Sequence, residues 1–445
     1  MTLRKILIAN RGEIAVRVLR ACKEMGLSTV AVYSEADAEA LHVHFADEAY
    51  CIGPAPARES YLNMRAVLSA AAVSGAQAIH PGYGLLSENA RFAALCAQCG
   101  IVFIGPPPQV IARMGDKDEA RRAMREAGVP VIPGTGLLET PEDARRESAE
   151  VGFPLLIKAR AGGGGRGIRR VDAPEELEKA FLTASAEAQA AFGDGGVYME
   201  RCLDRVKHVE VQILADAHGN IAALGERDCS MQRGNQKLLE ESPCAALPPE
   251  TRFQMLEASR RAARHVGYQG AGTMEYLLCE DGRFYFMEMN TRLQVEHPVT
   301  EMVSGIDLVK WQIRVAAGMP LDFAQEDVAL SGHSIECRIN AEDPKHGFRP
   351  SCGRITTLHV PGGPWVRFDT AVYQDYEVPP FYDSMIGKLI VHARTREECV
   401  RKMQAALCEL VLEGITHTGD LQRELLSSTA FLDGTYTTRF LAGMP

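Results

Sequence analysis

The sequence lacks a long uncharged apolar run. Its longest stretch without a charged residue lies between Arg65 and Glu88, and this stretch contains Gln77, His80 and Pro81. A helix that crosses a bilayer would not carry these residues. The first residues, MTLRKILIANRGE, also lack the apolar core and cleavage site of a signal peptide. We therefore expect a cytoplasmic protein that is not embedded in a membrane.

Clusters of basic residues and a metal-binding set of cysteines are missing as well. The 48 Lys and Arg residues are interspersed with 58 Asp and Glu residues, which gives a formal net charge of -10. Because binding to a phosphate backbone needs clustered cations, we do not expect nucleic acid as a partner. The 12 cysteines are scattered, and the close pair Cys96 and Cys99 has no second pair to complete a zinc site. The pattern indicates reduced thiols in a reducing cytosol.

The first part of the sequence alternates short apolar strands with helical stretches. Strands are predicted in KILIAN, STVAVY, AQAIH and IVFIG, and apolar residues recur at helical spacing after the first of them. This order is typical of a doubly wound parallel sheet, in which ligands gather at the carboxyl ends of the strands. The loop HPGYG, residues 80–84, follows the third strand at such an end.

The pattern changes near residue 115, where Asp116 begins a helix, and Thr140 with Pro141 begins another. From residue 154 onward paired strands predominate, and a helix from 396 to 413 that ends at Gly414 lies near the C-terminus. These patterns predict an α/β and α+β multidomain chain without internal repeats. The expected domains span 1–114, 115–330 and 331–445, with a lid subdomain at about 131–204.

Residues 162–167 read GGGGRG and follow a predicted strand that ends in Lys158. Without Cβ atoms, backbone N–H groups in such a loop can surround phosphate oxygens. A P-loop is excluded because Ile168 and Arg169 stand where Lys and Ser or Thr are needed, and a Rossmann fingerprint would lead into a helix rather than into IRRV. We favour a strand–loop–strand flap over nucleotide phosphates; the alternative is a flexible surface hairpin. Lys117 and Lys158 would add positive charge.

A predicted hairpin at residues 272–292 carries acidic side chains. Glu288 and Asn290 are two residues apart and project from one face, and Glu275 lies about as far before the turn as Glu288 lies after it. The neighbouring residues are apolar, which predicts burial, where an unpaired carboxylate is costly. Two carboxylates and an amide oxygen suit Mg²⁺. The alternative is an acid pair bridged to buried arginines.

Five further residues are candidates for handling a second, anionic substrate. Arg292, Gln294 and Glu296 continue the same alternation beyond Asn290, so they are expected on one strand edge with the metal ligands, and Lys237 and Arg338 come from other segments. An anion that is phosphorylated beside ATP must be held against charge repulsion, so fixed cations are expected. Glu296 is a candidate general base.

Six segments in order resemble the biotin carboxylases of the ATP-grasp superfamily: IANRGEIAVRVLRAC, HPGYGLLSEN, GGGGRG, ERDCSMQRGNQK, EMNTRLQVEHPVTE and ECRINAEDP. The resemblance runs nearly end to end. It implies a Rossmann-like N-terminal domain, an ATP-grasp domain with a glycine-loop lid and a β-rich C-terminal domain. The implied reaction forms carboxyphosphate from ATP and bicarbonate. Carboxyphosphate then decomposes to CO2 and phosphate, the phosphate takes the N1′ proton of biotin, and the resulting enolate attacks CO2.

The resemblance also implies roles for individual residues. Those that bind ATP would be Lys117, Lys158, Gly164, Gly165, Glu200, Arg201, Cys202, Leu203, His208 and Asn235. Those that bind Mg²⁺ or Mn²⁺, and so also support ATP, would be Glu275, Glu288 and Asn290. Those that hold bicarbonate would be Lys237, Arg292, Gln294 and Val295. Those beside biotin would be Tyr83, Gln232 and Arg338, and the catalytic set would be Lys237, Arg292, Glu296 as base and Arg338.

The sequence departs from the family pattern at two places. Gly234 and Asn235 stand where the family usually has Arg followed by His or Asn, which removes a cation near the phosphate end. Arg201 replaces a usual Lys, but the adenine contacts there are largely made by the backbone. We expect activity to survive both changes.

The resemblance further implies a homodimer whose partners are a biotin carboxyl carrier protein and carboxyltransferase subunits. No Ala-Met-Lys-Met biotinylation signature occurs in the sequence. We therefore expect a free subunit, of acetyl-CoA carboxylase in fatty-acid synthesis; the alternatives are a propionyl-CoA or pyruvate carboxylase. A regulatory nucleotide-binding module is a further alternative, but it would not need Lys237, Arg292, Glu296 and Arg338.

Overall fold

The computed structural model of the chain describes residues 2–160 and 167–443. It forms two compact units. The larger unit comprises Met1–Val129, Lys207–Leu277 and Glu288–Pro445, and the smaller unit comprises Pro130–Val206 and Leu278–Met287. Within the described ranges, none of the helices combines the length and the apolar character that crossing a bilayer requires.

The larger unit begins with a parallel sheet whose strand order is β3-β2-β1-β4-β5. Both faces of β1 are buried: Ile6 and Ile8 pack into one apolar cluster, and Leu7 packs into another. This burial on both faces confirms the predicted doubly wound sheet. The edge strand β3 was not predicted, because its alternate residues are exposed and it has no apolar run. The strands are β1 (Lys5–Ile8), β2 (Ser28–Tyr33), β3 (Glu48–Cys51), β4 (Ala78–His80) and β5 (Val102–Phe103).

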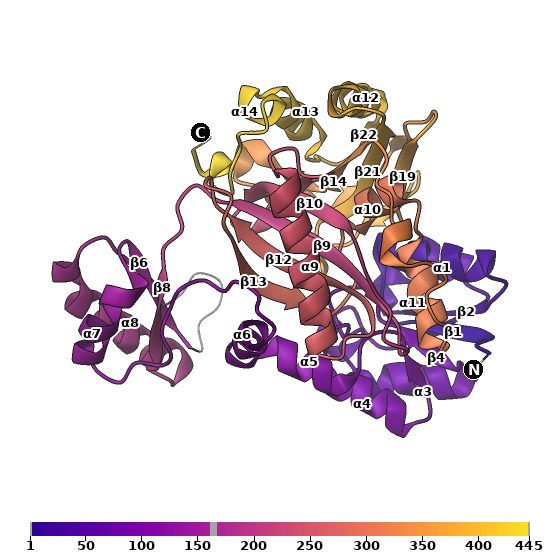
Figure 1. Cartoon of the computed structure of the whole chain (residues 1–445). Coiled ribbons are helices and arrows are strands. Elements are labelled where there is room, and N and C mark those ends of the chain that lie inside the picture. Colours follow the sequence, from indigo (N-terminus) through magenta and orange to yellow (C-terminus); the bar gives the residue numbers. More distant parts are fainter. Residues whose placement is uncertain (1, 161–166, 444–445) are drawn as a thin grey trace. The chain divides into compact units, whose positions relative to one another are not determined.

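Helices separate and follow these strands, as Figure 1 shows. The predicted helix start at Asp116 is confirmed, because its side chain accepts hydrogen bonds from the backbone N–H groups of Asp118 and Glu119. The helices are α1 (Gly12–Glu24), α2 (Leu41–Phe45), α3 (Met64–Ser74), α4 (Ala90–Gln98), α5 (Pro108–Gly115) and α6 (Lys117–Glu126).

A second sheet has eight strands in the order β13-β12-β9-β10-β11-β14-β21-β19. This sheet includes strands from both sides of residue 331, where the third domain was expected to begin, because β11 pairs in antiparallel register with β14. The predicted hairpin at 272–292 is confirmed as the neighbouring strands β12 and β13. Its strands are β9 (Lys207–Ala215), β10 (Ile221–Arg233), β11 (Gln236–Ser242), β12 (Gly270–Leu278), β13 (Phe284–Asn290), β14 (His333–Asn340), β19 (Val366–Thr370) and β21 (Met385–Ala393).

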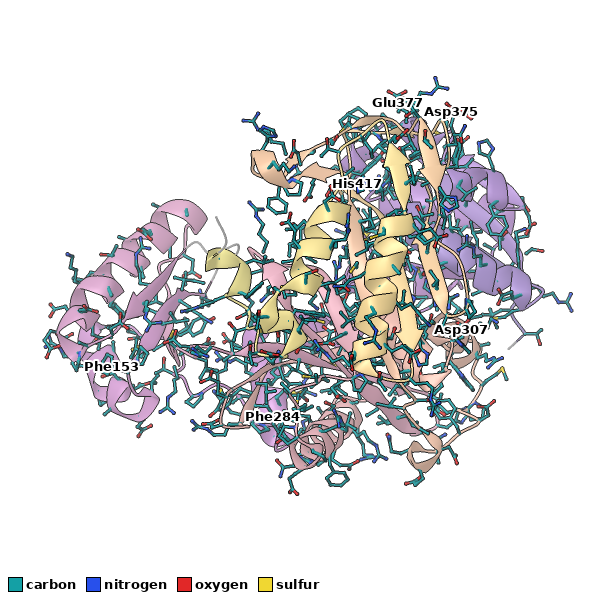
Figure 2. The ribbon with its side chains drawn as sticks, turned by 90° about the horizontal axis from the view of Figure 1, so that it is seen from above. Phe153, Phe284, Asp307, Asp375, Glu377 and His417 are labelled. Atoms are coloured by element: carbon teal, nitrogen blue, oxygen red, sulfur yellow. The ribbon has the colours of Figure 1, made fainter. Side chains whose placement is uncertain are left out.

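Helices cover parts of this second sheet. Helix α9 packs on β9 and β10, and α10 contacts β10, β14 and β21 (Figure 1). Short strand pairs follow β14 in the sequence, and Figure 2 labels the exposed residues Asp375, which precedes β20, and Glu377, which begins it. The remaining elements of this unit are α9 (Pro249–His265), α10 (His297–Ser304), α11 (Leu308–Ala316), β15 (Glu342–Asp343), β16 (Arg349–Pro350), β17 (Gly353–Arg354), β18 (Thr357–His359), β20 (Glu377–Val378), α13 (Gly419–Ser427) and α14 (Thr429–Leu432).

The helix predicted over 396–413 is shorter than expected. Helix α12 (Arg396–Glu409) begins as predicted at Thr395, whose hydroxyl accepts a hydrogen bond from the N–H of Glu398. It ends before Leu410, and the next residues form strand β22 (Val411–Glu413), which pairs with β18. The prediction of a stop at Gly414 was therefore wrong, because pairing with another strand overrides helical periodicity here.

The smaller unit contains a three-stranded sheet of order β7-β6-β8 with α7 and α8 packed on it. The antiparallel pairing of β6 with β7 confirms that strands flank the glycine loop. The glycines at 162–165 themselves lie outside the described residues. The elements are α7 (Pro141–Val151), β6 (Leu155–Ala159), β7 (Ile168–Val171), α8 (Leu177–Phe192) and β8 (Val197–Arg201).

The buried carboxylate of Glu241 forms hydrogen bonds that link the second sheet to residues near the C-terminus. Glu241 accepts hydrogen bonds from His333 Nε2 at 2.7 Å, from Arg396 Nε at 2.7 Å and from Tyr436 Oη at 2.6 Å. Burial raises the pKa of Glu241, but the bonds from His333 and Arg396 outweigh it and lower this pKa to about 2. The ionised carboxylate therefore stabilises the folded chain.

We expect Glu241→Gln to lower the free energy of unfolding by about 3–5 kcal/mol at neutral pH, because the partly buried Arg396 loses its carboxylate partner and the buried side chains of His333 and Tyr436 lose a charged acceptor. The folded-state pKa is depressed, so the contribution exists above the unfolded value near 4.5 and is lost as pH falls toward about 2. Urea unfolding at about pH 7 and about pH 3.5 should show the deficit shrinking at the lower pH. Tyr436→Phe, which removes one hydrogen bond, should cost only about 1 kcal/mol. A deficit independent of pH would contradict this role.

Candidate active site

Three carboxylates surround the ammonium group of Lys237. Its Nζ lies 2.6 Å from Glu210, 3.1 Å from Glu275 and 2.6 Å from Glu296. All three carboxylates are buried. Because a buried carboxylate without a partner is costly, the ammonium group stabilises the charged form of each.

Adjacent strands bring these acidic groups together. Glu210 lies on β9 and Glu275 on its neighbour β12. His208 precedes Glu210 by two residues on β9 and therefore lies on the same face, with its Nε2 2.9 Å from Glu275. The potential ligand atoms of His208, Glu210 and Glu275 all lie within 4.8 Å of one another. The convergence thus follows from the sheet order.

The charges around Lys237 shift its pKa and those of its partners. Burial alone would raise the pKa of Glu296, but Lys237 and Arg338 outweigh it and hold this pKa well below its ordinary value. Burial also raises the pKa of Glu275, yet Lys237 and His208 produce a net decrease. Burial lowers the pKa of Lys237, while the carboxylates raise it well above its ordinary value. Glu275 and Glu296 are therefore ionised at neutral pH, and Lys237 is protonated.

Glu210 and its buried partner Arg227 were not predicted from the sequence. Arg227 is fully buried, and its Nε lies 2.5 Å from Glu210 Oε1. Its Nη1 donates hydrogen bonds to Gln212 and Thr300 at 2.8 Å each. The available signal was the charged residues inside strands that also carry apolar residues, Glu210 in HVEVQ and Arg227 in GERD. Such a residue must be paired, which predicts a buried network.

The residues predicted to bind a metal ion lie together in the larger unit. Asn290 Nδ2 donates to Glu275 Oε1 at 2.8 Å. Glu288 lies two residues before Asn290 on β13 and is exposed to solvent, unlike the buried side chain that was predicted. Partial desolvation and then the nearby Glu275 carboxylate raise the pKa of Glu288. Two repelling carboxylates and an amide oxygen fit a hard divalent cation, so the ligand assignment stays a prediction consistent with the geometry.

The expected continuation of the strand beyond Asn290 was wrong. β13 ends at that residue, and 291–296 form a loop that leads into α10. The loop nevertheless brings Arg292 to Asn290 at 3.0 Å and to Gln294 at 2.9 Å, and Gln294 donates to Glu275 at 3.0 Å. These hydrogen bonds, rather than strand alternation, place the side chains near Glu275.

A second buried cation, Lys388, binds the loop at residues 291–296. Lys388 on β21 donates to the backbone carbonyl of Val295 at 2.7 Å, and its Nζ lies 3.2 Å from Glu13. Glu13 also accepts a hydrogen bond from the hydroxyl of Tyr83. Neither Lys388 nor Glu13 was singled out from the sequence, although Lys388 is a charge inside the apolar strand MIGKLI. The structure thus links Tyr83 and Val295 through one buried pair.

Arg338 on β14 completes the cluster of cations. Its Nη2 lies 2.9 Å from Glu296 Oε2 and 2.6 Å from Glu240 Oε1. Gln232 lies opposite Lys237 in the pairing of β10 with β11. The structure therefore gathers Lys237, Glu296 and Arg338 as predicted, while the biotin contacts of Tyr83 and Gln232 stay predictions.

Gly234 and Asn235 form the two-residue turn between β10 and β11. Their φ angles are 54° and 68°, and Arg233 pairs with Gln236 on either side. Hairpin turns of this kind need positive φ at both central residues, for which Gly and Asn are well suited. The departure from the family pattern is therefore compatible with the local fold, and an ATP contact of Asn235 stays a prediction.

The remaining predicted ATP residues are distributed over both units. In the smaller unit Lys158 forms an ion pair with Glu200, and Arg201 Nε donates to the carbonyl of Val151 at 2.7 Å. Cys202 donates its backbone N–H to Pro154 at 2.8 Å, and Leu203 follows it after β8. Lys117 is exposed at the start of α6 in the larger unit. Gly164 and Gly165 lie outside the described residues.

Three family models match the chain in succession. Residues 2–111 match the biotin carboxylase N-terminal domain, and residues 336–443 match the biotin carboxylase C-terminal domain. Residues 116–324 match the ATP binding domain of the carbamoyl-phosphate synthase L chain.

Curated and solved relatives cover nearly the whole chain. A biotin carboxylase from Nostoc is 54% identical over 441 residues, 99% of each chain. The crystal structure of a biotin carboxylase–β,γ-ATP complex from Campylobacter jejuni has a TM-score of 0.93 at 51% identity and covers 99% of each chain. The biotin carboxylase domain dimer of Hydrogenobacter thermophilus 2-oxoglutarate carboxylase, with MgADP, ADP and bicarbonate, has a TM-score of 0.91 at 50% identity and covers 99% of this chain and 98% of that one. With its three domain matches and these full-length relatives, the chain belongs to the biotin carboxylase family of ATP-dependent carboxylases.

Proposed function

We propose that this chain uses ATP and bicarbonate to carboxylate biotin carried on a biotin carboxyl carrier protein. The observation that carries the proposal is Glu296, a fully buried carboxylate that contacts both Lys237 and Arg338. A nucleotide-binding module would not need a buried carboxylate between two cations, whereas a carboxylase that handles bicarbonate needs both a base and positive charge.

Glu296 takes the proton of bicarbonate in the first step. Lys237 and Arg338 hold the pKa of Glu296 low, which makes this carboxylate a weak base before bicarbonate binds. Bicarbonate, as an anion, draws the ammonium group of Lys237 toward itself, which removes part of the stabilisation of the carboxylate and raises its pKa. The freed bicarbonate oxygen attacks the terminal phosphorus of ATP, the bond to ADP breaks, and carboxyphosphate forms. Lys237 and Arg292 hold the negative charge that develops.

Biotin reacts in the second step. The C–O bond of carboxyphosphate breaks to give CO2 and phosphate, the phosphate accepts the N1′ proton of biotin, and N1′ attacks CO2. Arg338 stabilises the enolate oxygen of biotin, and Tyr83 and Gln232 orient the ring. Glu275, Glu288 and Asn290 hold Mg²⁺ or Mn²⁺, which neutralises phosphate charge when it is bound.

The wider assignment rests on the family. We propose domains at 1–114, 115–330 and 331–445, a homodimer, a cytoplasmic location and carboxyltransferase subunits as further partners. Acetyl-CoA is the proposed final acceptor. The similar structure from a 2-oxoglutarate carboxylase makes a keto acid the second candidate. The carrier and transferase subunits that co-purify with the chain decide between them.

The proposed chemistry is tested by the dependence of ATP hydrolysis on bicarbonate. In the purified chain, bicarbonate should raise ATP hydrolysis by about tenfold or more, because general-base attack by bicarbonate replaces slow attack by water. Free biotin should accelerate the reaction further and should become carboxylated. ATP hydrolysis that is indifferent to bicarbonate would reject the proposal, and nucleotide binding without turnover would favour a regulatory module.

A further inference from the structure

Arg338 is held by two acidic side chains. On one side its Nη2 contacts Glu296, and on the other its Nε donates to Glu240 Oε1 at 2.7 Å, while Nη2 reaches the same oxygen at 2.6 Å. Glu240 is fully buried on β11. Because a guanidinium group is planar, contacts from Nε and Nη2 fix its orientation as well as its position.

Glu240 is well placed for Arg338 by strand pairing. It lies directly opposite Glu336 in the antiparallel register of β11 and β14. Cross-strand partners share a face of the sheet, and Arg338 is two residues from Glu336, so all three side chains lie on one face. Within the described residues, the second oxygen of Glu240, Oε2, is buried and accepts no hydrogen bond. The other oxygen, Oε1, is the one that binds Arg338.

We propose that Glu240 is a positioning residue for the biotin half-reaction and that it holds the guanidinium group of Arg338 in place in its ionised state. The inference rests on the proposed function, because it assigns Arg338 to the biotin enolate. Glu240 itself touches Arg338 and does not replace Glu296 as the base.

The ionisation of Glu240 depends on pH near neutrality. Burial raises the pKa of Glu240 to about 7, although Arg338 lowers it, and the negative Glu296 adds to the increase. Protonation below this pH removes the charge that fixes Arg338, so the biotin reaction should lose rate on the acid side. The titratable groups that face Glu240 are Arg338, Glu296, Lys237, Glu336, Cys229 and Cys337.

Glu336 provides a matched control on the same face of the sheet. Both of its carboxyl oxygens are buried and lack a hydrogen-bond partner among the described residues. Burial raises the pKa of Glu336 well above its ordinary value, although Lys388 opposes this. Burial therefore favours the neutral form of Glu336, and Glu336→Gln preserves the shape of that form.

The test compares two activities of the whole chain over about pH 6 to 9. One is bicarbonate-dependent ATP hydrolysis without biotin, and the other is carboxylation of free biotin. In the wild type, biotin carboxylation should show an acid limb near pH 7. In Glu240→Gln, kcat for biotin carboxylation should fall by about 10- to 100-fold, the loss of one charge-assisted contact, and the limb near neutrality should disappear. ATP hydrolysis should stay within about threefold of the wild type, because Lys237, Arg292 and Glu296 are unchanged.

Two further variants keep the test decisive. Glu240→Asp keeps the charge but withdraws it from Arg338, so the rate should fall while the acid limb remains, and it carries the test if Glu240→Gln does not fold. Glu336→Gln should leave both activities and the limb unchanged. The proposal is overturned if Glu240→Gln keeps the limb, if both activities fall by the same factor, or if Glu336→Gln is equally impaired. Failure of the proposed function is distinct, because wild-type ATP hydrolysis would then ignore bicarbonate.

Discussion

Replacing Glu288 by glutamine is expected to lower the rate of biotin carboxylation by about a thousandfold or more. Glu288 is exposed on β13 two residues before Asn290, which contacts Glu275. Partial desolvation and repulsion from Glu275 raise its pKa, so a divalent cation held by both carboxylates would stabilise the charged form of Glu288. A glutamine keeps the shape but removes one of the two negative ligands that a divalent cation needs.

The decisive measurement is the dependence of the rate on Mg²⁺ concentration. The concentration for half-maximal rate should rise in Glu288→Gln, while thermal unfolding should change little, because an exposed side chain contributes only about 0.5 kcal/mol. Glu413→Gln removes the same charge at an exposed residue of strand β22 and should behave like the wild type. An unchanged Mg²⁺ dependence in Glu288→Gln would show that this residue is not a ligand.

The sequence was sufficient for the parts of the fold that depend on local patterns. Helix starts at Asp116 and Thr395 were predicted from capping side chains, and the start at Thr140 from the proline that follows it; all three side chains accept backbone N–H groups. The hairpin at 272–292 was predicted from its turn and its alternation. The end of α12 was missed, because the pairing of β22 with β18 is a contact between segments far apart in sequence.

Some residues of the candidate site were chosen from the sequence, but the contacts between them were not predicted. Glu275, Asn290 and Glu296 were chosen for their chemistry, and the structure places them around shared hydrogen-bond partners. The loop at 291–296 and the partners Glu210 and Glu240 were not predicted, because they depend on which strands are neighbours. Strand order is a property of the whole sheet, and no local pattern in β9 or β11 specifies it.

Replacing Lys237 by methionine is expected to abolish turnover and to lower the free energy of unfolding by about 3–5 kcal/mol at neutral pH. Methionine fills much of the space of the Lys237 side chain but leaves Glu210, Glu275 and Glu296 without their shared ammonium group. Three buried carboxylates cannot all remain ionised in these surroundings. Bicarbonate would also lose the cation that lies beside its proposed base, so catalysis fails even in molecules that fold.

The pH dependence of stability distinguishes this mechanism from a simple packing defect. In the wild type Lys237 helps to depress the pKa of Glu275 below its ordinary value, so this contribution is present above the unfolded pKa and is lost as pH falls. Without Lys237 the carboxylates have raised pKa values, so the variant is penalised more as pH rises. The deficit measured by urea unfolding should therefore shrink between about pH 8 and about pH 5. Lys23→Met removes an exposed pair with Asp47 and should cost at most about 1 kcal/mol at either pH. A deficit in Lys237→Met that is the same at both pH values would mean that lost packing, and not lost charge, destabilises the variant.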